Sequence, residues 1–261
     1  MQSFGHFMDA LTSASVDVAA LAILLIFILP FIVFTVRAKS GRRFPLRPIR
    51  AYERLQSLVS QATESGRPIH VGLGSGQAGD VATPETVMGL TVFDFVARHA
   101  AASNQPILGT AGEATVLAAA QGVLQNARRE AGFPERYTGR ELNFYGPDPF
   151  AYAAGSLAAL ERREHLASVL IGRFGAEGLW IAESSRDPEM TQLGGTSSPH
   201  AMALMGTALD ETVIGEEIYA AGAYLHRPSH LGSLATQDVV RVVVILVILV
   251  GVVMTLLGYW G

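Results

Sequence analysis

A glycine-rich turn in the first third of the chain has the residue types that bind phosphate groups. In the run HVGLGSGQAGD, residues 70–80, Gly74, Gly76 and Gly79 have the spacing G-x-G-x-x-G and follow an apolar run. In dinucleotide-binding domains such glycines let the backbone approach a pyrophosphate at the start of a helix. The alternative is that these glycines serve only the geometry of a tight turn.

The turn departs from the dinucleotide pattern. Asp80 would repel a phosphate, and residues 80–83 separate the third glycine from Pro84, where we expect the first turn of a helix. The next predicted strand ends Leu108-Gly109-Thr110, without the acidic residue that would hold a ribose. We therefore predict no bound cofactor.

The elements that must position these residues alternate between short apolar runs and longer helical patterns. The predicted strands are 68–73, 105–109, 141–146, 166–172, 191–193 and 211–215. The predicted helices are 51–65, 85–102, 113–131, 148–163, a shorter one through residue 183, 200–207 and 216–225. Strands that alternate with helices imply right-handed crossovers and a parallel sheet. The predicted fold class is α/β: a three-layer, Rossmann-like sandwich with a mostly parallel sheet of about six strands.

Glycine follows the last apolar residue of every predicted strand. The pairs are Leu73-Gly74, Leu108-Gly109, Tyr145-Gly146, Ile171-Gly172, Leu193-Gly194 and Ile214-Gly215. A glycine at the end of a strand permits a tight turn into the next helix. We therefore predict that these glycines belong to the geometry of the whole sheet.

Ligands of open α/β sheets bind beyond the carboxyl ends of the strands. The polar residues predicted at that edge are Ser75, Thr110, Glu113, Asp148, Arg173, Glu177, Thr196, His200, Glu216 and Glu217. If the edge binds a ligand, the cofactor-binding residues are expected to be Gly74, Ser75, Gly76, Thr110, Gly194 and Thr196.

No recognised catalytic constellation appears in this set. Ser75 is out of register with the nucleophile elbow G-x-S-x-G, and a phosphate-binding P-loop would need a lysine, which residues 55–237 lack. The adjacent Glu216 and Glu217 are expected to complement a helix dipole. We assign no catalytic residue.

No metal site is predicted either. The chain has no cysteine, so thiolate sites and disulfides are excluded. His226 and His230 have the i,i+4 spacing of helical metal ligands, but Pro228 lies between them. His200, in the small-residue loop 194–200, is the one histidine predicted near the pocket edge, but we favour a packing role for it over a role in a site.

The composition indicates a membrane protein. The 261 residues are 49% hydrophobic and 16% charged, whereas soluble domains carry roughly 25% charged residues. Two uncharged segments, 18–36 and 242–258, account for the difference. Each approaches the roughly 20 apolar residues that cross a bilayer as a helix. Neither contains an ionisable group of the kind that marks a transport pathway.

Basic residues set the expected orientation. No Lys or Arg precedes position 37, and then residues 37–54 contain seven basic residues and one acid. Because cytoplasmic flanks collect Lys and Arg, we expect the region between the two membrane segments to be cytoplasmic and both termini to be outside. The predicted organisation is an extracytoplasmic tail (1–17), a first membrane helix (18–36), a basic juxtamembrane segment (37–54), a cytoplasmic α/β domain (55–237) and a second membrane helix (238–261).

The basic juxtamembrane segment, 37–54, is expected to contact anionic lipid headgroups, where each cation contributes about 1 kcal/mol. A plain topology signal would have the same composition. With −4 on the whole chain and +6 on this segment, the remainder carries −10, which disfavours nucleic acid as a partner.

Several motifs resemble those of a family of uncharacterised bacterial two-pass membrane proteins, grouped under a domain of unknown function. The matching residues are RPIRAYERL (47–55), LGSG (73–76), DPFAYAAG (148–155), QLGGT (192–196), IGEEIYAAGAYL (214–225) and QDVVR (237–241). The resemblance implies the bacterial inner membrane and a cytoplasmic Rossmann-like domain. It implies no activity and no catalytic residues.

Two function classes follow. The first is a structural subunit, anchored in the membrane, that self-associates into a homo-oligomer such as a ring; the stretch 218–225 has small residues that allow close helix contact. The second is a membrane-tethered sensor or enzyme that binds a small ligand or nucleotide with its strand-end loops. We expect the first, because no catalytic signature accompanies the loops.

Overall fold

The computed structural model describes residues 18–39, 47–76, 79, 83–161, 165–185, 188–225 and 228–256. The predicted tail 1–17, residues 40–46 of the basic juxtamembrane segment, and His226 lie outside these ranges. The chain divides into two compact units, one formed by 1–45 with 227–261 and the other by 46–226.

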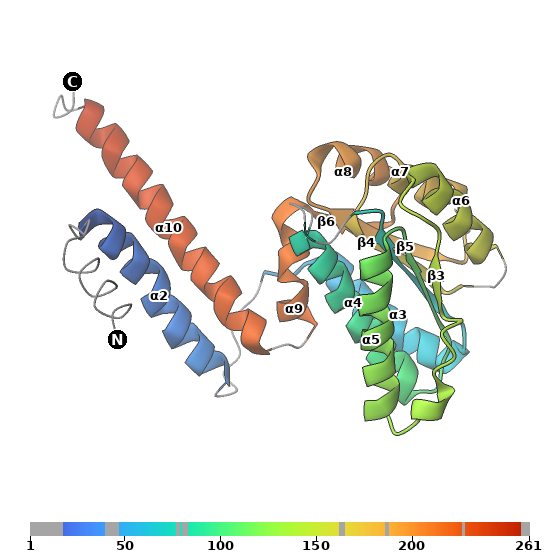
Figure 1. Cartoon of the computed structure of the whole chain (residues 1–261). Helices are drawn as coiled ribbons and strands as arrows, with labels where there is room; N and C mark the ends of the chain where they lie inside the picture. The colour runs from blue at the N-terminus through green and yellow to red at the C-terminus, as the bar shows by residue number, and fades with distance from the viewer. Residues whose placement is uncertain are drawn as a thin grey trace, which may run out of the picture. The chain divides into compact units, whose positions relative to one another are not determined.

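The larger unit contains a six-stranded parallel sheet, in agreement with the predicted α/β fold (Figure 1). Its strands are β1 (Ile69–Gly74), β2 (Ile107–Ala111), β3 (Leu142–Phe144), β4 (Ala167–Arg173), β5 (Thr191–Thr196) and β6 (Glu211–Ile214). The spatial order is β3-β2-β1-β4-β5-β6, and every neighbouring pair is parallel. The chain leaves β1 in one direction and β4 in the other, so the strand order reverses between them. This switch point is where open α/β sheets bind ligands.

Helices cover both faces of the sheet and make three layers (Figure 1). One face packs against α3 (Arg50–Ser65), α4 (Thr83–Ala102), α5 (Ala114–Glu130) and α9 (Ala221–Tyr224). The other is covered by α6 (Pro149–Leu160), α7 (Glu177–Ser184) and α8 (Pro199–Met205). Two 3-10 helices, η1 (Pro134–Arg136) and η2 (Gly215–Ala220), complete the unit.

Local sequence explains where these helices begin and end. Asp148 accepts a hydrogen bond from the Ala151 amide. Pro149 follows it in the first turn of α6, where a backbone N–H would have no acceptor within the helix, so proline is tolerated there. Glu113 caps α5 in the same way through the Val116 amide. At the other end of a helix, Gly66 closes α3 in the left-handed conformation, with φ of 73°.

The prediction that a glycine ends every strand is correct only in part. Gly74 ends β1 and Gly215 follows β6, but Gly109, Gly172 and Gly194 lie inside strands. A Cβ on Gly194 would lie 2.3 Å from the carbonyl oxygen of Leu170 on β4. These interior glycines therefore permit close approach of neighbouring chain segments. The hydrogen-bonded pairing of β5 with its neighbouring strands continues to Thr196, and sequence periodicity does not show this pairing.

The smaller unit consists of two helices that lie side by side, α2 (Val18–Lys39) and α10 (Pro228–Leu256) (Figure 1). Within α10, the stretch Leu234–Val253 is long and apolar enough to cross a membrane. The apolar part of α2 among the described residues, Ile23–Arg37, is shorter. The two helices approach closely at Gly232, where a Cβ would lie 2.8 Å from the Cα of Thr35.

Candidate functional site

The candidate site lies at the switch point, where the loops after β1 and β4 meet. Gly74 has φ of 82°, and a Cβ on it would lie 2.1 Å from the carbonyl oxygen of Arg173. The next amide, Ser75 N–H, donates to that same carbonyl oxygen at 3.1 Å. Gly74 is thus required by the close approach of two strand ends, which supports the geometric interpretation of the glycine turn.

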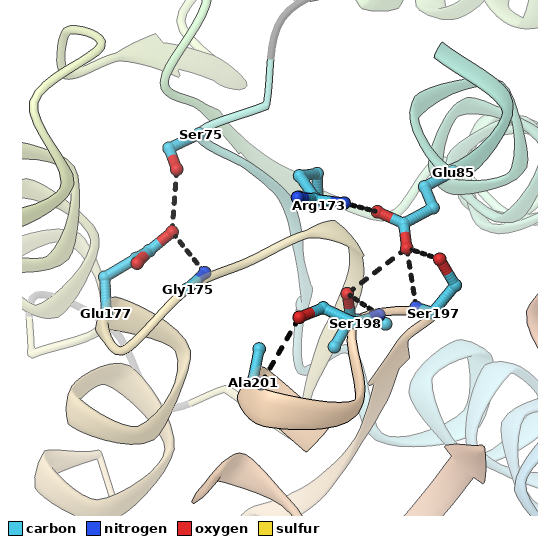
Figure 2. Close-up of polar contacts among 9 residues, drawn as sticks. Ser75, Glu85, Arg173, Gly175, Glu177, Ser197, Ser198 and Ala201 are labelled. Atoms are coloured by element: carbon cyan, nitrogen blue, oxygen red, sulfur yellow. Dashed lines mark hydrogen bonds and ion pairs between the residues drawn. The ribbon is translucent and has the colours of Figure 1, made fainter. Parts of the chain in front are cut away.

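Ser75 and Glu177 bridge the switch point (Figure 2). The Ser75 hydroxyl donates to Glu177 Oε1 at 2.7 Å, and the Gly175 amide donates to the same oxygen at 2.9 Å. Glu177, the first residue of α7, is buried. Its carboxylate therefore occupies donors that an anionic ligand would need.

A second carboxylate, that of Glu85 in α4, lies beyond the ends of β4 and β5 (Figure 2). Its Oε1 accepts hydrogen bonds from the Ser197 amide at 2.6 Å and from the Ser197 hydroxyl, and Thr196 Oγ1 lies 3.5 Å away. Its Oε2 forms an ion pair with Arg173 at 3.9 Å. Glu85 is only 1% exposed, whereas the Arg173 side chain is 43% exposed. A buried carboxylate requires such compensation.

Beneath this edge, His70 joins three strands through buried hydrogen bonds. Its Nδ1 lies 2.9 Å from Ser168 Oγ on β4 and its Nε2 lies 3.0 Å from Thr110 Oγ1 on β2. Burial, with a smaller contribution from nearby His165, lowers the pKa of His70 to about 3. The imidazole is therefore neutral at physiological pH, and one ring nitrogen donates while the other accepts.

The same chain of contacts continues to the end of β1. Thr110 Oγ1 lies 3.2 Å from the hydroxyl of Tyr152 on α6, and this hydroxyl accepts a hydrogen bond from the Gly74 amide at 3.1 Å. Burial raises the pKa of Tyr152. Thr110 is fully buried here, so it belongs to the interior network and not to the open edge.

The other predicted edge residues are dispersed. Glu113 and Asp148 cap helices, as described above, and His200 is exposed at the start of α8. Gly194 lies in the interior of β5, while Gly76 is half-buried just after β1. Among the predicted residues, the structure brings Ser75 together with Glu177. It also brings Arg173 and Thr196 to the same carboxylate, that of Glu85.

Glu217 belongs to a separate cluster that joins the two ends of the larger unit. Its carboxylate pairs with Arg47, and its carbonyl oxygen accepts a hydrogen bond from the Tyr52 hydroxyl at 3.1 Å. The ring of Tyr52 stacks on that of Tyr224, with centroids 5.4 Å apart, and burial raises the pKa of Tyr52. The motifs 47–55 and 214–225 therefore contact one another, while Glu216 lies exposed beside them.

Sequence reasoning missed Glu85, Ser197, Tyr152 and Ser168. Each is a polar residue within or beside an apolar run, a signal that could have drawn attention to Glu85 in TPETVMGL and to Tyr152 in DPFAYAAG. The partners described above for these residues lie 42 to 112 residues away in the chain, which no local pattern reveals. Within the described ranges, no three His, Asp or Glu side chains cluster so as to hold a metal ion.

All of the residues described at the switch point lie in the part of the chain that matches a protein-family model. A family described as "Domain of unknown function (DUF6754)" matches residues 11–260, which is nearly the whole chain. The chain belongs to the DUF6754 family. No curated protein and no solved structure matches it. The match is consistent with the resemblance to an uncharacterised family, and its description names no activity.

Proposed function

We propose that this DUF6754 protein is a membrane-anchored scaffold subunit that self-associates into a homo-oligomer through its α/β unit and its membrane helices. In this proposal α2 and α10 span the bacterial inner membrane, both termini are outside, and the α/β unit is cytoplasmic. The apolar stretch in α10 and the basic residues after α2 support the anchoring. Arg47, Arg50 and Arg54 belong to the segment proposed to contact anionic headgroups.

The occupation of the switch point supports a structural role over a catalytic one. Glu177 and Glu85 accept the hydrogen bonds of the serines nearest to them, Ser75 and Ser197. A ligand phosphate would have to displace one of these carboxylates and would meet its negative charge. The edge at which an α/β enzyme binds its substrate is thus engaged in internal contacts.

The observation that carries the proposal of self-association is an apolar outer face on α6. Residues 149–160 contain no charged residue, and Ala151, Ala154 and Ala158 are exposed. Phe150 is 61% exposed and packs against the 44%-exposed Trp180 of α7, with ring centroids 4.5 Å apart. Exposed apolar patches of this kind mark protein contact sites.

The test is the molar mass of the detergent-extracted protein, measured by light scattering over a range of concentrations. We expect an oligomer for the wild type and a smaller species for Phe150→Glu. Val87→Glu is the matched control, because Val87 is also an exposed apolar residue in the first turns of a helix. A monomeric wild type at every concentration would rule out self-association.

A second proposal is ligand binding at the strand-end loops, and the exposed guanidinium of Arg173 is the observation that favours it. An anion that pairs with Arg173 would lie beside Ser75 and Glu177. Thermal-shift screening with nucleotides, sugar phosphates and acyl-CoA tests this proposal, with Arg173→Gln as the variant that should lose any response. If no compound in the panel shifts the Tm, the ligand-binding proposal is wrong and only the scaffold proposal remains.

A further inference from the structure

The membrane-length stretch of α10 contains two charged residues. The stretch is Leu234–Val253, and it includes Asp238 and Arg241. At 1.5 Å of rise per residue, these two lie about 6 Å and about 10 Å along the helix axis from the first residue of the stretch. Charged side chains within a bilayer are unfavourable, so they face protein or water and pair with groups of opposite charge.

The packing of α10 on α2 indicates the same depth independently. Thr35, near the end of α2, meets Gly232, near the start of α10, and the two helices lie side by side, so they run antiparallel (Figure 1). Arg241 lies nine residues after Gly232, and Ile26 lies nine residues before Thr35. Arg241 is therefore level with Ile26, which is close to the middle of the uncharged segment 18–36.

Both charged residues lie on the face of α10 that points away from α2. Gly232 and Thr236 are buried and mark the face that packs on α2. With 3.6 residues per turn, the opposite face carries a row of exposed residues, here called the outer seam: Asp238, Arg241, Ile245, Ile248 and Val252. Their alternating spacing of three and four residues is that of helices that pack along one another.

The charges of the outer seam are the part that lipid does not accommodate. Lipid tails solvate isoleucine and valine, but a carboxylate among them needs a partner. No residue that the structure describes forms an ion pair with Asp238. A second copy of the chain carries an arginine three residues from its own Asp238, at nearly the same depth. The seam is thus complementary in charge to itself.

We propose that the outer seam is the contact between two copies of this chain in the membrane, with Asp238 of each copy paired to Arg241 of the other. Identical copies insert in the same direction, so their α10 helices run parallel and the four charges lie close to one level. Two acids and two bases form a neutral group, and Ile245 and Ile248 pack beside it. This inference rests on the proposed function and gives its membrane helices a specific contact.

Cysteine cross-linking in membranes tests the contact, because the chain has no cysteine of its own. We expect Ile248→Cys to form disulfide-linked dimers under mild oxidation. Val247→Cys is the matched control: Val247 is the adjacent residue, is 66% exposed, and points away from the outer seam, so it should remain monomeric. No dimer from Ile248→Cys, or equal dimer from both variants, would overturn the proposal.

Charge reversal tests the ion pairs in the Ile248→Cys background. Asp238→Arg and Arg241→Asp each leave four like charges, and each should weaken dimer formation about tenfold or more, the scale of an interhelical polar contact in a membrane. The combined change restores alternating charges and should restore the cross-link. Asp238→Asn, which adds no charge, should also weaken the dimer. Unchanged cross-linking in Asp238→Asn would contradict the ion pair, even if the reversed variants failed to insert.

Light scattering of the wild-type protein separates this inference from the proposed function. An oligomer in detergent, together with no cross-link at Ile248→Cys, would overturn the outer seam and leave self-association intact. A monomer at every concentration, again with no cross-link, would overturn both.

Discussion

Ser75 and Glu177 are joined by a hydrogen bond of 2.7 Å across the point where the strand order of the sheet reverses. The bond links the end of β1 to the start of α7, two segments 102 residues apart in the chain. Because Glu177 is buried, its carboxylate depends on this hydroxyl and on the Gly175 amide to replace water.

Loss of the Glu177 carboxylate should therefore destabilise the fold. We expect Glu177→Ala to lower the free energy of unfolding by about 1–3 kcal/mol, the range for removing a hydrogen-bonded charged group. Denaturant titration of the detergent-solubilised protein measures the effect, with the exposed Glu135→Ala as control. In a double-mutant cycle, Ser75→Ala should cost little once Glu177 is absent; full additivity would show that the two residues are not coupled.

His70 should make stability depend on pH. Its pKa is about 3 in the folded state and near 6.5 in the unfolded chain, so below pH 6.5 the unfolded state binds a proton that the folded state does not. This contribution to stability is complete above pH 6.5 and falls by up to about 1.4 kcal/mol per pH unit as the pH decreases toward 3.

The comparison variant is His70→Gln, which cannot take up that proton. We expect it to be less stable at pH 7.5, because Ser168 and Thr110 lose a partner, and to lose less stability between pH 6.5 and 4.5 than the wild type does. Denaturant midpoints at several pH values measure both effects. Equal slopes for the two proteins would show that His70 is not the titrating group.

Gly74 should tolerate no side chain. In Gly74→Val the new Cβ would meet the Arg173 carbonyl oxygen, at a φ of 82° that β-branched residues rarely adopt. We expect a loss of stability of about 2 kcal/mol or more, or failure to fold. Gly122→Ala is the control, because Gly122 lies in α5 with open space around its Cβ position, and alanine there should be neutral or stabilising.

The contact between α2 and α10 depends on Gly232. A Cβ at this position would lie 2.5 Å from Thr35 Oγ1 and 2.8 Å from its Cα, so Gly232→Leu must separate the helices. Overpacking of this kind typically costs about 1–3 kcal/mol. We expect a lower Tm in detergent micelles for Gly232→Leu and little change for Gly251→Leu, where space is open. Equal Tm values for the two variants would contradict close packing at Gly232.

The sequence by itself determined the features that depend on local pattern. Apolar runs that alternate with amphipathic helices required a parallel α/β sheet, and the motif at Asp148-Pro149 marked the start of α6. The long uncharged stretches indicated membrane helices, of which the structure supports one by length among the described residues. These properties follow from periodicity, capping and hydrophobicity, which act over a few residues.

Only the tertiary structure decided which polar groups meet. Glu85 lies 112 residues before the amide that binds it, and His70 lies 40 and 98 residues from its two partners. Likewise, pairing between neighbouring strands, and not the position of glycine, decided where β5 ends. The physical reason is that a buried polar group takes its partners from whichever chain segments the sheet order brings together, and that order is a property of the whole fold.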